Sequence, residues 1–406
     1  MSTVPWRGRP FGLETHSRQA LTTTPPALGR GRQVAVVGGS GFYGRYLGAD
    51  LLRFTGVQVL VASRRAPQRL RRTDRVVPIA CDLRNPRALR EVIRGSAVVV
   101  HCAGPFQHLP LEPLRAAIAT GVHYVDISED RAYRRRVLAA DTEARAVGIV
   151  VLNGASVVPG MEVLFTELLR PGFDELLAVC GSAAPDTRRH RGHAMFHTML
   201  LGAGRPFQAP RDGLPVRVHG WREPEWFDFP PPVGRRLHYQ VLEMADLDVL
   251  PELFGVGTVT FKAGSEFPLL NRLLGAAAAL RARTGHPRLE AYTSLVRGLS
   301  WLVGRCGNDA GGVIFQITGR RGGMPQRRAV AVVGEHDGGR IPTVLAGMAV
   351  QELLAGRLAT PGVANLRSWL PQAHLIQGLV DRGLRLSWRQ DAGTWQDFRA
   401  AQVGGC

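Results

Sequence analysis

A short glycine-rich segment near the start of the chain has the residue types and spacing that a phosphate-binding turn requires. It reads Gly38-Gly39-Ser40-Gly41-Phe42-Tyr43-Gly44, in which Gly39, Gly41 and Gly44 follow the G-x-G-x-x-G spacing. Glycines permit the tight turn and let the backbone approach a pyrophosphate, which the amide groups at a helix N-terminus then bind. An apolar run at 34–37 precedes the motif and a helical pattern over 46–54 follows it. This context predicts a dinucleotide-binding βαβ unit rather than a plain connecting turn.

The end of the second apolar run, 57–62, carries the residues that select between the two nicotinamide cofactors. Ser63, Arg64 and Arg65 follow it, and none is a carboxylate. An acidic residue there would bind the ribose 2′-hydroxyl of NAD, whereas an arginine favours the 2′-phosphate of NADP. A guanidinium can bind that phosphate through two charge-assisted hydrogen bonds, and Ser63 could donate a third. The prediction is NADP(H), and the alternative is that composition alone placed two arginines here.

Composition limits what can be argued from charge. The formal net charge is +18, which by itself would favour nucleic acid or an anionic membrane as a partner. Lys262 is the only lysine among 51 basic residues, so arginine is used almost everywhere a cation occurs. The basic stretches 64–75 and 131–136 also lack the interleaved aromatic residues of single-strand binders. We therefore expect a solvated basic surface and no nucleic-acid partner.

Cysteine usage and hydropathy indicate the compartment. The five cysteines form no C-x-x-C pair and have no zinc-site spacing, so neither a disulfide framework nor a structural zinc site is predicted. No apolar run reaches the roughly 18 residues of a membrane span, and residues 1–32 lack the apolar core of a secretory signal. We expect a cytoplasmic protein whose first 32 residues form a disordered tail.

The elements that must position these residues alternate along the chain. Further apolar runs at 76–80, 97–102, 122–127 and 149–152 are separated by helical patterns, which is typical of a doubly wound parallel sheet. Ligands lie beyond the carboxyl ends of the strands in such sheets. The turns after two of these runs should therefore line the cofactor, and they contain Asp82, Leu83, Ala103, Gly104, Pro105 and Phe106. Asp82 either reaches the adenine amino group or caps the helix that begins near Pro86.

Candidate acid-base groups lie at the end of the fifth run. Strand alternation places Tyr124 and Asp126 on one face with His123 opposite, so we predict Tyr124 and Asp126 as the proton donor or substrate anchor. The alternative is a strand-end network without chemistry. His193 and His197 have the i, i+4 spacing of one helix face and follow His190, but no H-E-x-x-H pattern exists, so no metal is expected.

Four motifs in order resemble the NADP-binding domain of the saccharopine dehydrogenase-like oxidoreductases. They are the glycine segment 38–44, His-Cys-Ala-Gly-Pro-Phe-Gln at 101–107, Val-His-Tyr-Val-Asp at 122–126 and Gly-Ala-Ser-Val-Val-Pro-Gly at 154–160. The resemblance implies a Rossmann domain, a central α/β domain inserted before the C-terminus and a final segment that packs back on the first domain. It also implies that 103–106 line the nicotinamide and 39–44 the pyrophosphate. Many relatives carry an acidic residue and a serine where this chain has Ser156 and Val157, so an amino-acid substrate is not implied.

The remaining sequence predicts a second domain. Strand patterns occur at 176–180, 215–219, 258–261, 313–318 and 328–333, helical patterns occur at 268–283 and 292–303, and 221–232 is predicted as an ordered loop. A helix over 342–355 has apolar residues around most of its circumference and should be buried between lobes. The predicted fold is a Rossmann doubly wound parallel sheet with a second α+β domain of mixed sheet and covering helices. The predicted domain boundaries are 1–32, 33–160, 161–335 and a helical segment over 336–406 that returns to the Rossmann domain.

These features favour an NADP(H)-dependent oxidoreductase that moves a hydride to or from a carbonyl, imine or activated alkene of a small-molecule substrate. One alternative is a non-catalytic NADP(H)-binding sensor or scaffold protein. A second is a reductase that acts on lipid-linked substrates at a membrane surface, suggested by the apolar helical stretch 269–280 and the basic surface. The further partners considered are a membrane surface, bound peripherally, and a second copy of the chain in a homodimer.

Overall fold

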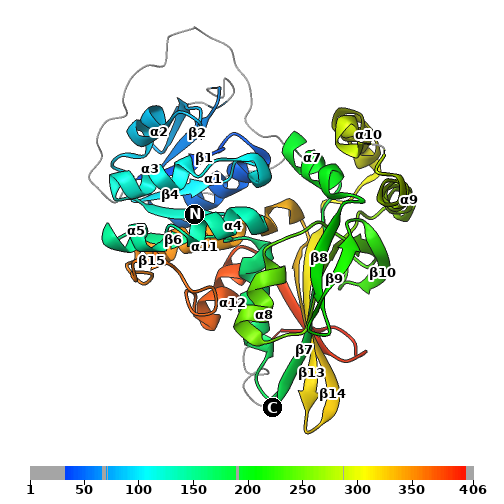
Figure 1. The fold of residues 1–406 in the computed structure, drawn as a ribbon. Helices are drawn as coiled ribbons and strands as arrows, with labels where there is room; N and C mark the ends of the chain where they lie inside the picture. Colours follow the sequence, from blue (N-terminus) through cyan, green and yellow to red (C-terminus); the bar gives the residue numbers. More distant parts are fainter. Residues whose placement is uncertain (1–32, 66–69, 71, 189–191, 287, 399–406) are drawn as a thin grey trace, which may run out of the picture.

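The computed structural model describes residues 33–65, 70, 72–188, 192–286 and 288–398. The chain forms two lobes, each built around its own β-sheet (Figure 1). The tail predicted over residues 1–32 lies outside the described residues.

The first lobe is the predicted Rossmann domain. Its seven-stranded sheet has the order β15-β6-β5-β4-β1-β2-β3, and every neighbouring pair is parallel. The strands are β1 (Gln33–Val37), β2 (Gln58–Ser63), β3 (Val76–Ala80), β4 (Val98–His101), β5 (His123–Asp126), β6 (Val150–Leu152) and β15 (Gly362–Val363). The strand order reverses between β1 and β4, which is the switch point where doubly wound sheets bind dinucleotides.

Helices cover both faces of this sheet, and burial explains its strand sequences. They are α1 (Phe42–Phe54), α2 (Pro86–Ile93), α3 (Glu112–Thr120), α4 (Arg131–Leu138), α5 (Asp141–Ala146) and, from the C-terminal segment, α11 (Ile341–Leu354). The central strands are continuous valine-rich runs, and Val34, Val36, Val99 and Val100 have no exposed surface. Such runs are typical of parallel strands that are covered on both faces.

The second lobe contains the predicted mixed sheet. Its order is β10-β11-β12-β7-β13-β14-β16-β17, in which β7 and β12 are parallel and the other pairs are antiparallel. The strands are β7 (Glu175–Ala184), β10 (Arg222–Asp228), β11 (Arg235–Gln240), β12 (Thr258–Ala263), β13 (Gly311–Arg321), β14 (Met324–Gly334), β16 (Arg385–Gln390) and β17 (Gln396–Asp397). A separate hairpin is formed by β8 (Pro206–Arg211) and β9 (Leu214–His219). The remaining helices are α6 (Glu162–Leu169), α7 (His193–Gly202), α8 (Asp246–Phe254), α9 (Pro268–Thr284), α10 (Thr293–Val303) and α12 (Gln372–Asp381).

Two sequence expectations differ from this lobe. The segment 221–232, predicted as a loop, contains strand β10, an edge strand that tolerates Pro224 because only one of its sides is paired. The segment 336–406, predicted as helical, returns to the first lobe through α11 and β15, but β16 and β17 extend the second sheet. Backbone pairing of β16 with β14 and burial of Leu386 hold β16 in that sheet.

Ion pairs fix the second lobe and the C-terminal segment against the first lobe. Arg131 of α4 donates to Asp248 of α8 at 2.7 Å and to Glu243 at 2.8 Å. Arg382, which follows α12, donates to both carboxylate oxygens of Asp50 in α1 at 2.7 and 2.9 Å. The backbone amide of Ala245 also donates to the carbonyl of Glu129, in the loop after β5. These contacts bring the second lobe to the carboxyl end of β5.

None of the helices in the described part of the chain is long and apolar enough to cross a membrane.

Candidate active site

The glycine segment forms the turn between β1 and α1, and its glycines have different roles. Gly38 has a φ of +80°, and a Cβ there would lie 2.6 Å from the amide nitrogen of Ala103. A Cβ at Gly44 would lie 2.4 Å from the carbonyl oxygen of Gly38. Both positions therefore need glycine so that chain segments can touch.

Gly41 is different because it leaves space on the side of the turn that faces solvent. It is exposed, is the N-cap of α1 and has an ordinary φ of −71°. Among the described atoms, a Cβ there would meet only the Gly38 carbonyl oxygen, at 3.0 Å. A glycine N-cap has no side chain to cover the first amide groups of the helix, so they are available to an anion. This open end fits the pyrophosphate of a dinucleotide.

The aromatic residues of the turn connect it to the second lobe. The Phe42 ring makes edge contacts with Tyr43 and Tyr46, each with centroids 5.2 Å apart. A Cβ added at Gly339 would lie 2.9 Å from Cζ of Phe42. Ser40, in contrast, is exposed beside Gly41. The pyrophosphate end of the site is therefore bordered by both lobes.

The predicted 2′-phosphate site lies at the carboxyl end of β2. Arg64 and Arg65 are exposed there, and no carboxylate stands between 58 and 65. The Ser63 hydroxyl donates to the carbonyl oxygen of Arg65 at 2.8 Å, so in this state its proton is already used. The arginines fit a phosphate group, whereas Ser63 shapes the turn that carries them.

The turn after β3 shows whether Asp82 caps the helix that follows it. Its carboxylate accepts from the amide of Arg84 at 3.0 Å, while the cap of α2 is Asn85, which accepts from Ala88 at 3.1 Å. The interpretation of Asp82 as the cap of that helix is therefore wrong. Asp82 is exposed at the end of β3 and Leu83 is buried beneath it.

The predicted nicotinamide wall follows β4. Ala103 contacts the glycine turn through the close approach at Gly38, and Gly104, Pro105 and Phe106 continue the loop. Phe106 is buried, and its ring packs edge-on against His101 at 4.8 Å and Tyr133 at 5.1 Å between centroids. The turns after β1, β2, β3 and β4 thus line one edge of the sheet, as predicted for a dinucleotide crevice.

Tyr124 lies behind this wall in a buried cluster. It has no exposed surface, and its hydroxyl is 2.9 Å from the Tyr133 hydroxyl and 3.3 Å from Nδ1 of His101. Burial raises the pKa of Tyr124 well above its usual value, and burial lowers the pKa of His101 to about 3. Both groups are therefore neutral at physiological pH.

Asp126 also has no exposed surface, and protein donors surround its carboxylate. It accepts from the backbone amides of Ser128 at 3.0 Å and Gly154 at 2.9 Å, and from the side chain of Asn153 at 2.9 and 3.0 Å. Burial raises the pKa of Asp126, and the hydrogen bonds from Asn153 and Gly154 oppose that rise. The carboxylate joins the end of β5 to the loop after β6. In this conformation neither Tyr124 nor Asp126 presents surface to a substrate.

Three histidines gather in front of the wall instead. His193 and His197 of α7 stack with centroids 5.9 Å apart, and His108, just after the nicotinamide loop, is 6.4 Å from His197. His108 and His193 are exposed, and His197 is half-buried with Nδ1 3.3 Å from the Thr293 hydroxyl. A Cβ added at Gly104 would lie 3.9 Å from Cβ of Ala194, so α7 of the second lobe rests against the loop of the first.

The sequence alone does not show that these three histidines lie beside the predicted nicotinamide loop. The i, i+4 pair was visible, and His108 comes directly after the motif at 101–107. No local signal indicates that α7 lies against that motif, because the contact is between lobes. His190 lies outside the described residues. Within the described ranges, no group of three His, Cys, Asp or Glu side chains could hold a metal ion.

Two buried carboxylic acids lie near the same edge. Glu162 follows the loop after β6 and has no exposed surface, and neither of its carboxylate oxygens has a hydrogen-bond partner within the described part of the chain. Asp246, at the start of α8, is 1 % exposed, and burial raises its pKa to about 7. The pKa of Glu162 is also raised, first by burial and then by the charge of Asp246.

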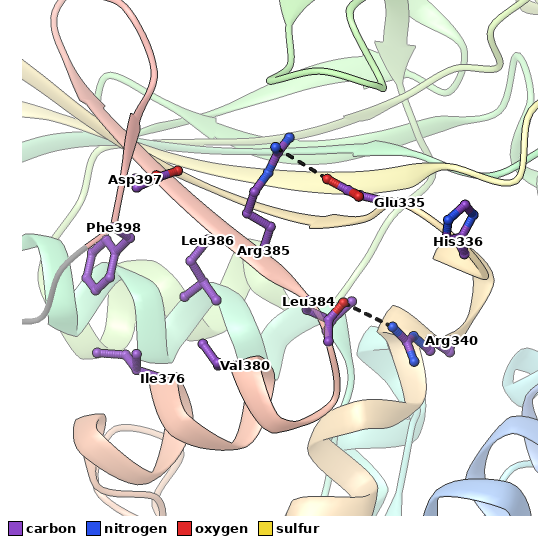
Figure 2. Close-up of a pocket in the computed structure, with 11 residues that line it drawn as sticks. Glu335, His336, Arg340, Ile376, Val380, Leu384, Arg385, Leu386, Asp397 and Phe398 are labelled. Carbon is purple, nitrogen blue, oxygen red and sulfur yellow. Dashed lines mark hydrogen bonds and ion pairs between the residues drawn. The ribbon is translucent and has the colours of Figure 1, made fainter. Parts of the chain in front are cut away.

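A cavity of about 530 Å³ lies away from these groups, between α12, β16 and the turn at 335–340. Figure 2 shows Arg385 paired with Glu335 at its rim, and Arg340 donates to the Gly383 carbonyl at 3.3 Å. None of the predicted cofactor residues lines it. This cavity is therefore separate from the predicted dinucleotide site at the sheet edge.

Comparison with known proteins agrees with this geometry. Residues 34–152 match the family described as the saccharopine dehydrogenase NADP binding domain. No curated protein sequence matches the chain significantly.

Similar solved structures extend across most of the chain. One is apo saccharopine dehydrogenase (L-Glu forming) from Saccharomyces cerevisiae, with 16 % identity and a TM-score of 0.62, covering 89 % of this chain and 100 % of that one. Another is C. glutamicum DAP dehydrogenase in complex with DAP, with 15 % identity and a TM-score of 0.44, covering 86 % and 99 %. The first shows that both lobes share the saccharopine dehydrogenase fold. The cofactor is NADP, and residues 34–152 form a domain that matches the saccharopine dehydrogenase NADP binding domain.

Proposed function

We propose that the protein is an NADP(H)-dependent oxidoreductase that transfers a hydride to or from a carbonyl, imine or activated alkene of a small-molecule substrate. One observation supports this most: α7 of the second lobe places His193 and His197 beside the loop that forms the nicotinamide wall of the first lobe. A protein that only sensed NADP(H) would not need proton-donating groups at that point. An enzyme needs them, because hydride transfer to a polar double bond requires a proton at the other atom.

In this proposal the first lobe binds the cofactor, which supplies the hydride when bound. The backbone amides after Gly41 would hold the pyrophosphate, and Arg64, supported by Arg65, would hold the 2′-phosphate. Ala103 to Phe106 form the wall against which the nicotinamide is oriented. The close packing of Gly38 on Ala103 fixes that wall relative to the phosphate turn.

The second lobe supplies the proton. Nδ1 of His197 lies 3.3 Å from the Thr293 hydroxyl, so Nε2 is the ring nitrogen that we propose to face a substrate, and His193 stacks on the same ring. An imidazole ring nitrogen can donate a proton to a substrate atom or accept one from it. We assign His197 as the proton donor. The rings of His193 and His108 are its neighbours.

In this proposal Tyr124 and Asp126 support the site and do not contact the substrate. Asp126 holds the ends of β5 and β6 together, and Tyr124 with Tyr133 and His101 backs the ring of Phe106. We therefore propose them as positioning residues rather than groups that touch the substrate.

The test follows NADPH consumption by the full chain with panels of ketones, imines and activated alkenes. Once a substrate is found, His197→Phe should lower turnover by roughly 100-fold while NADPH affinity stays within a few-fold. His374→Ala, which removes a partly exposed histidine of α12, is the matched control and should leave turnover unchanged. Tight NADPH binding without turnover on any panel would favour the sensor alternative instead. Equal turnover in His197→Phe would remove His197 from the mechanism.

A further inference from the structure

Helices α9 and α10 carry an unusual share of the exposed apolar surface. Sixteen large apolar side chains are exposed in the described part of the chain, and nine of them lie between 269 and 302. They are Leu269, Leu270, Leu273, Leu280, Tyr292, Leu295, Leu299, Trp301 and Leu302. Helix α9 packs against β11, and both helices lie at the outer edge of the second lobe (Figure 1). Exposed apolar side chains concentrated in one part of a protein mark an interaction site.

The orientation of α9 is the reverse of that expected for a helix on a protein surface. Its leucines at 269, 273 and 280 point outward, with exposed fractions of 66, 58 and 54 %. Its buried face consists of Asn271, Gly275, Ala278 and Arg281. A soluble helix normally buries its apolar stripe, so this inversion needs an apolar partner.

Specific contacts hold α9 in this orientation. The Arg281 guanidinium donates to the carbonyls of Leu200 at 3.0 Å and Ala203 at 3.2 Å and pairs with Glu290 at 3.1 Å. The Asn271 amide donates to the carbonyl of Leu237 at 3.0 Å. A Cβ at Gly275 would lie 2.6 Å from the Tyr239 ring, so the helix could not rotate to bury its leucines without losing this fit.

Helix α10 repeats the pattern. Leu295, Leu299 and Leu302 recur at i, i+4 and i+7 and are exposed by 59, 53 and 58 %, while the one buried residue of the helix is Thr293. Trp301 is 53 % exposed, and the guanidinium of Arg305 stacks on its ring at 3.6 Å. Leucine, tryptophan and arginine together are the side chains that interfacial helices insert among lipid headgroups.

The positive charge of residues 268–306 favours an anionic partner. Between 268 and 306 the sequence contains six arginines and one acidic residue, Glu290, which is already paired with Arg281. The other arginines are at 272, 283, 288, 297 and 305. Two copies of this face would bring like charges together, whereas an anionic bilayer neutralises them and buries the leucines at the same time.

We propose that the face formed by α9 and α10 binds the surface of an anionic phospholipid bilayer, and we call it the docking face. Helix α7, with its two histidines, stands between the docking face and the first lobe (Figure 1). Because α7 contacts α10, docking brings the helix that carries His193 and His197 close to the membrane. The docking face itself does not depend on the proposed reaction.

The test is co-sedimentation of the full chain with vesicles of equal parts phosphatidylglycerol and phosphatidylcholine, and with vesicles of phosphatidylcholine alone. We expect binding to the anionic vesicles, weaker binding to the neutral ones, and loss of the anionic component at high salt. The double variant Leu273→Ser/Leu299→Ser should lower the bound-to-free ratio on anionic vesicles by roughly 100-fold, because burying each of the two leucines contributes about a factor of ten.

The matched control is Leu214→Ser/Met324→Ser, which removes two apolar side chains that are 67 and 72 % exposed outside the docking face. It should bind vesicles like the unaltered chain. Thermal unfolding and NADPH affinity should be the same in all three proteins, so loss of vesicle binding cannot come from unfolding. The proposal is overturned if the unaltered chain stays in the supernatant, or if both double variants bind equally. It is also overturned if the chain is a dimer without lipid that Leu273→Ser/Leu299→Ser dissociates.

Discussion

The two sides of the candidate active site are built differently. The cofactor side consists of backbone turns at one sheet edge, from residues 38 to 106, and its key contacts are between chain segments that glycine allows to touch. The histidine side consists of side chains that approach each other across two lobes, from His108 to His197. The predicted cofactor contacts are thus encoded locally, whereas the histidines that we propose to face the substrate come together only through the packing of the two lobes.

This difference explains why the cofactor can be inferred and the substrate cannot. A phosphate needs amide groups and a cation at fixed spacing, which a sequence displays directly. A substrate pocket needs only that particular side chains converge, and many sequences satisfy that condition. Substitutions in the predicted cofactor turns should therefore impair NADPH binding, while the histidine side of the site stays intact.

The largest effect is expected at the phosphate turn. Gly41→Val keeps an ordinary backbone conformation but places a branched side chain at the open end of α1, so NADPH affinity should fall by roughly 100-fold or more with little loss of fold. Isothermal calorimetry measures this directly. Gly48→Ala, a change farther along the same helix where a Cβ meets no described atom, is the control and should bind NADPH normally. Unchanged affinity in Gly41→Val would move the phosphate site elsewhere.

The next effect concerns stability at the end of β5. Asp126→Asn replaces a buried acceptor of four hydrogen bonds with an amide that directs its own N–H groups at some of those donors. We expect the free energy of unfolding to fall by about 3 kcal/mol, measured by chemical denaturation. A variant that stays fully stable yet loses turnover would show that Asp126 takes part in the chemistry, and Asp126 would return to the catalytic group.

A smaller effect separates the two cofactors. Arg64→Ala should weaken NADPH by roughly 1.5 to 3 kcal/mol, because it removes a charge-assisted bond to the 2′-phosphate, and should leave NADH nearly unchanged. Ser63→Ala is the comparison, and it should change NADPH affinity little because that hydroxyl already donates to Arg65. Titrations with both nucleotides decide the matter. Equal losses for NADPH and NADH in Arg64→Ala would transfer the role to Arg65.

The smallest effect is a pH dependence from Asp246, a buried acid near the loop after β5. The pKa of Asp246 is 3.8 when unperturbed and rises to about 7 in the folded state, so the folded chain binds the extra proton between these values. Folding stability is therefore fully present below the unfolded pKa and declines as pH rises through the folded pKa. Asp246→Asn removes that decline and should stabilise the fold by roughly 1 to 2 kcal/mol at about pH 8 relative to about pH 5. Thermal melts at both pH values test this, and a gain of the same size at both would argue against a titrating Asp246.

The fold was predictable where the burial pattern is strong. Continuous valine runs define β1 to β6, and a helix that is apolar on all sides, α11, is buried against α1 and the first sheet. Strand β10 was missed because it is an exposed edge strand with a proline, so its alternation is weak. Strand β16 was missed because its two arginines and glutamine mask a short buried segment around Leu386.

The position of part of the candidate site was also predictable. Residues 38 to 44, 63 to 65 and 103 to 106 could be chosen from the sequence, and all lie at one sheet edge, where cofactor binding by them stays a prediction. Strand alternation correctly placed Tyr124 and Asp126 at the end of β5, but it does not show that both are fully buried. His108 could not be chosen because its neighbours, His193 and His197, come from another lobe.

Hydride transfer by this protein is tested most directly with NADPH that carries deuterium at its hydride-bearing nicotinamide carbon. The full chain is incubated with the labelled cofactor and mixtures of carbonyl, imine and activated alkene compounds, and the products are read by mass spectrometry. We expect deuterium on the former double-bonded carbon of one compound class, with transfer lost in Gly41→Val and strongly reduced in His197→Phe. Labelled NADPH that binds tightly but keeps its deuterium in every mixture would contradict hydride transfer by this protein.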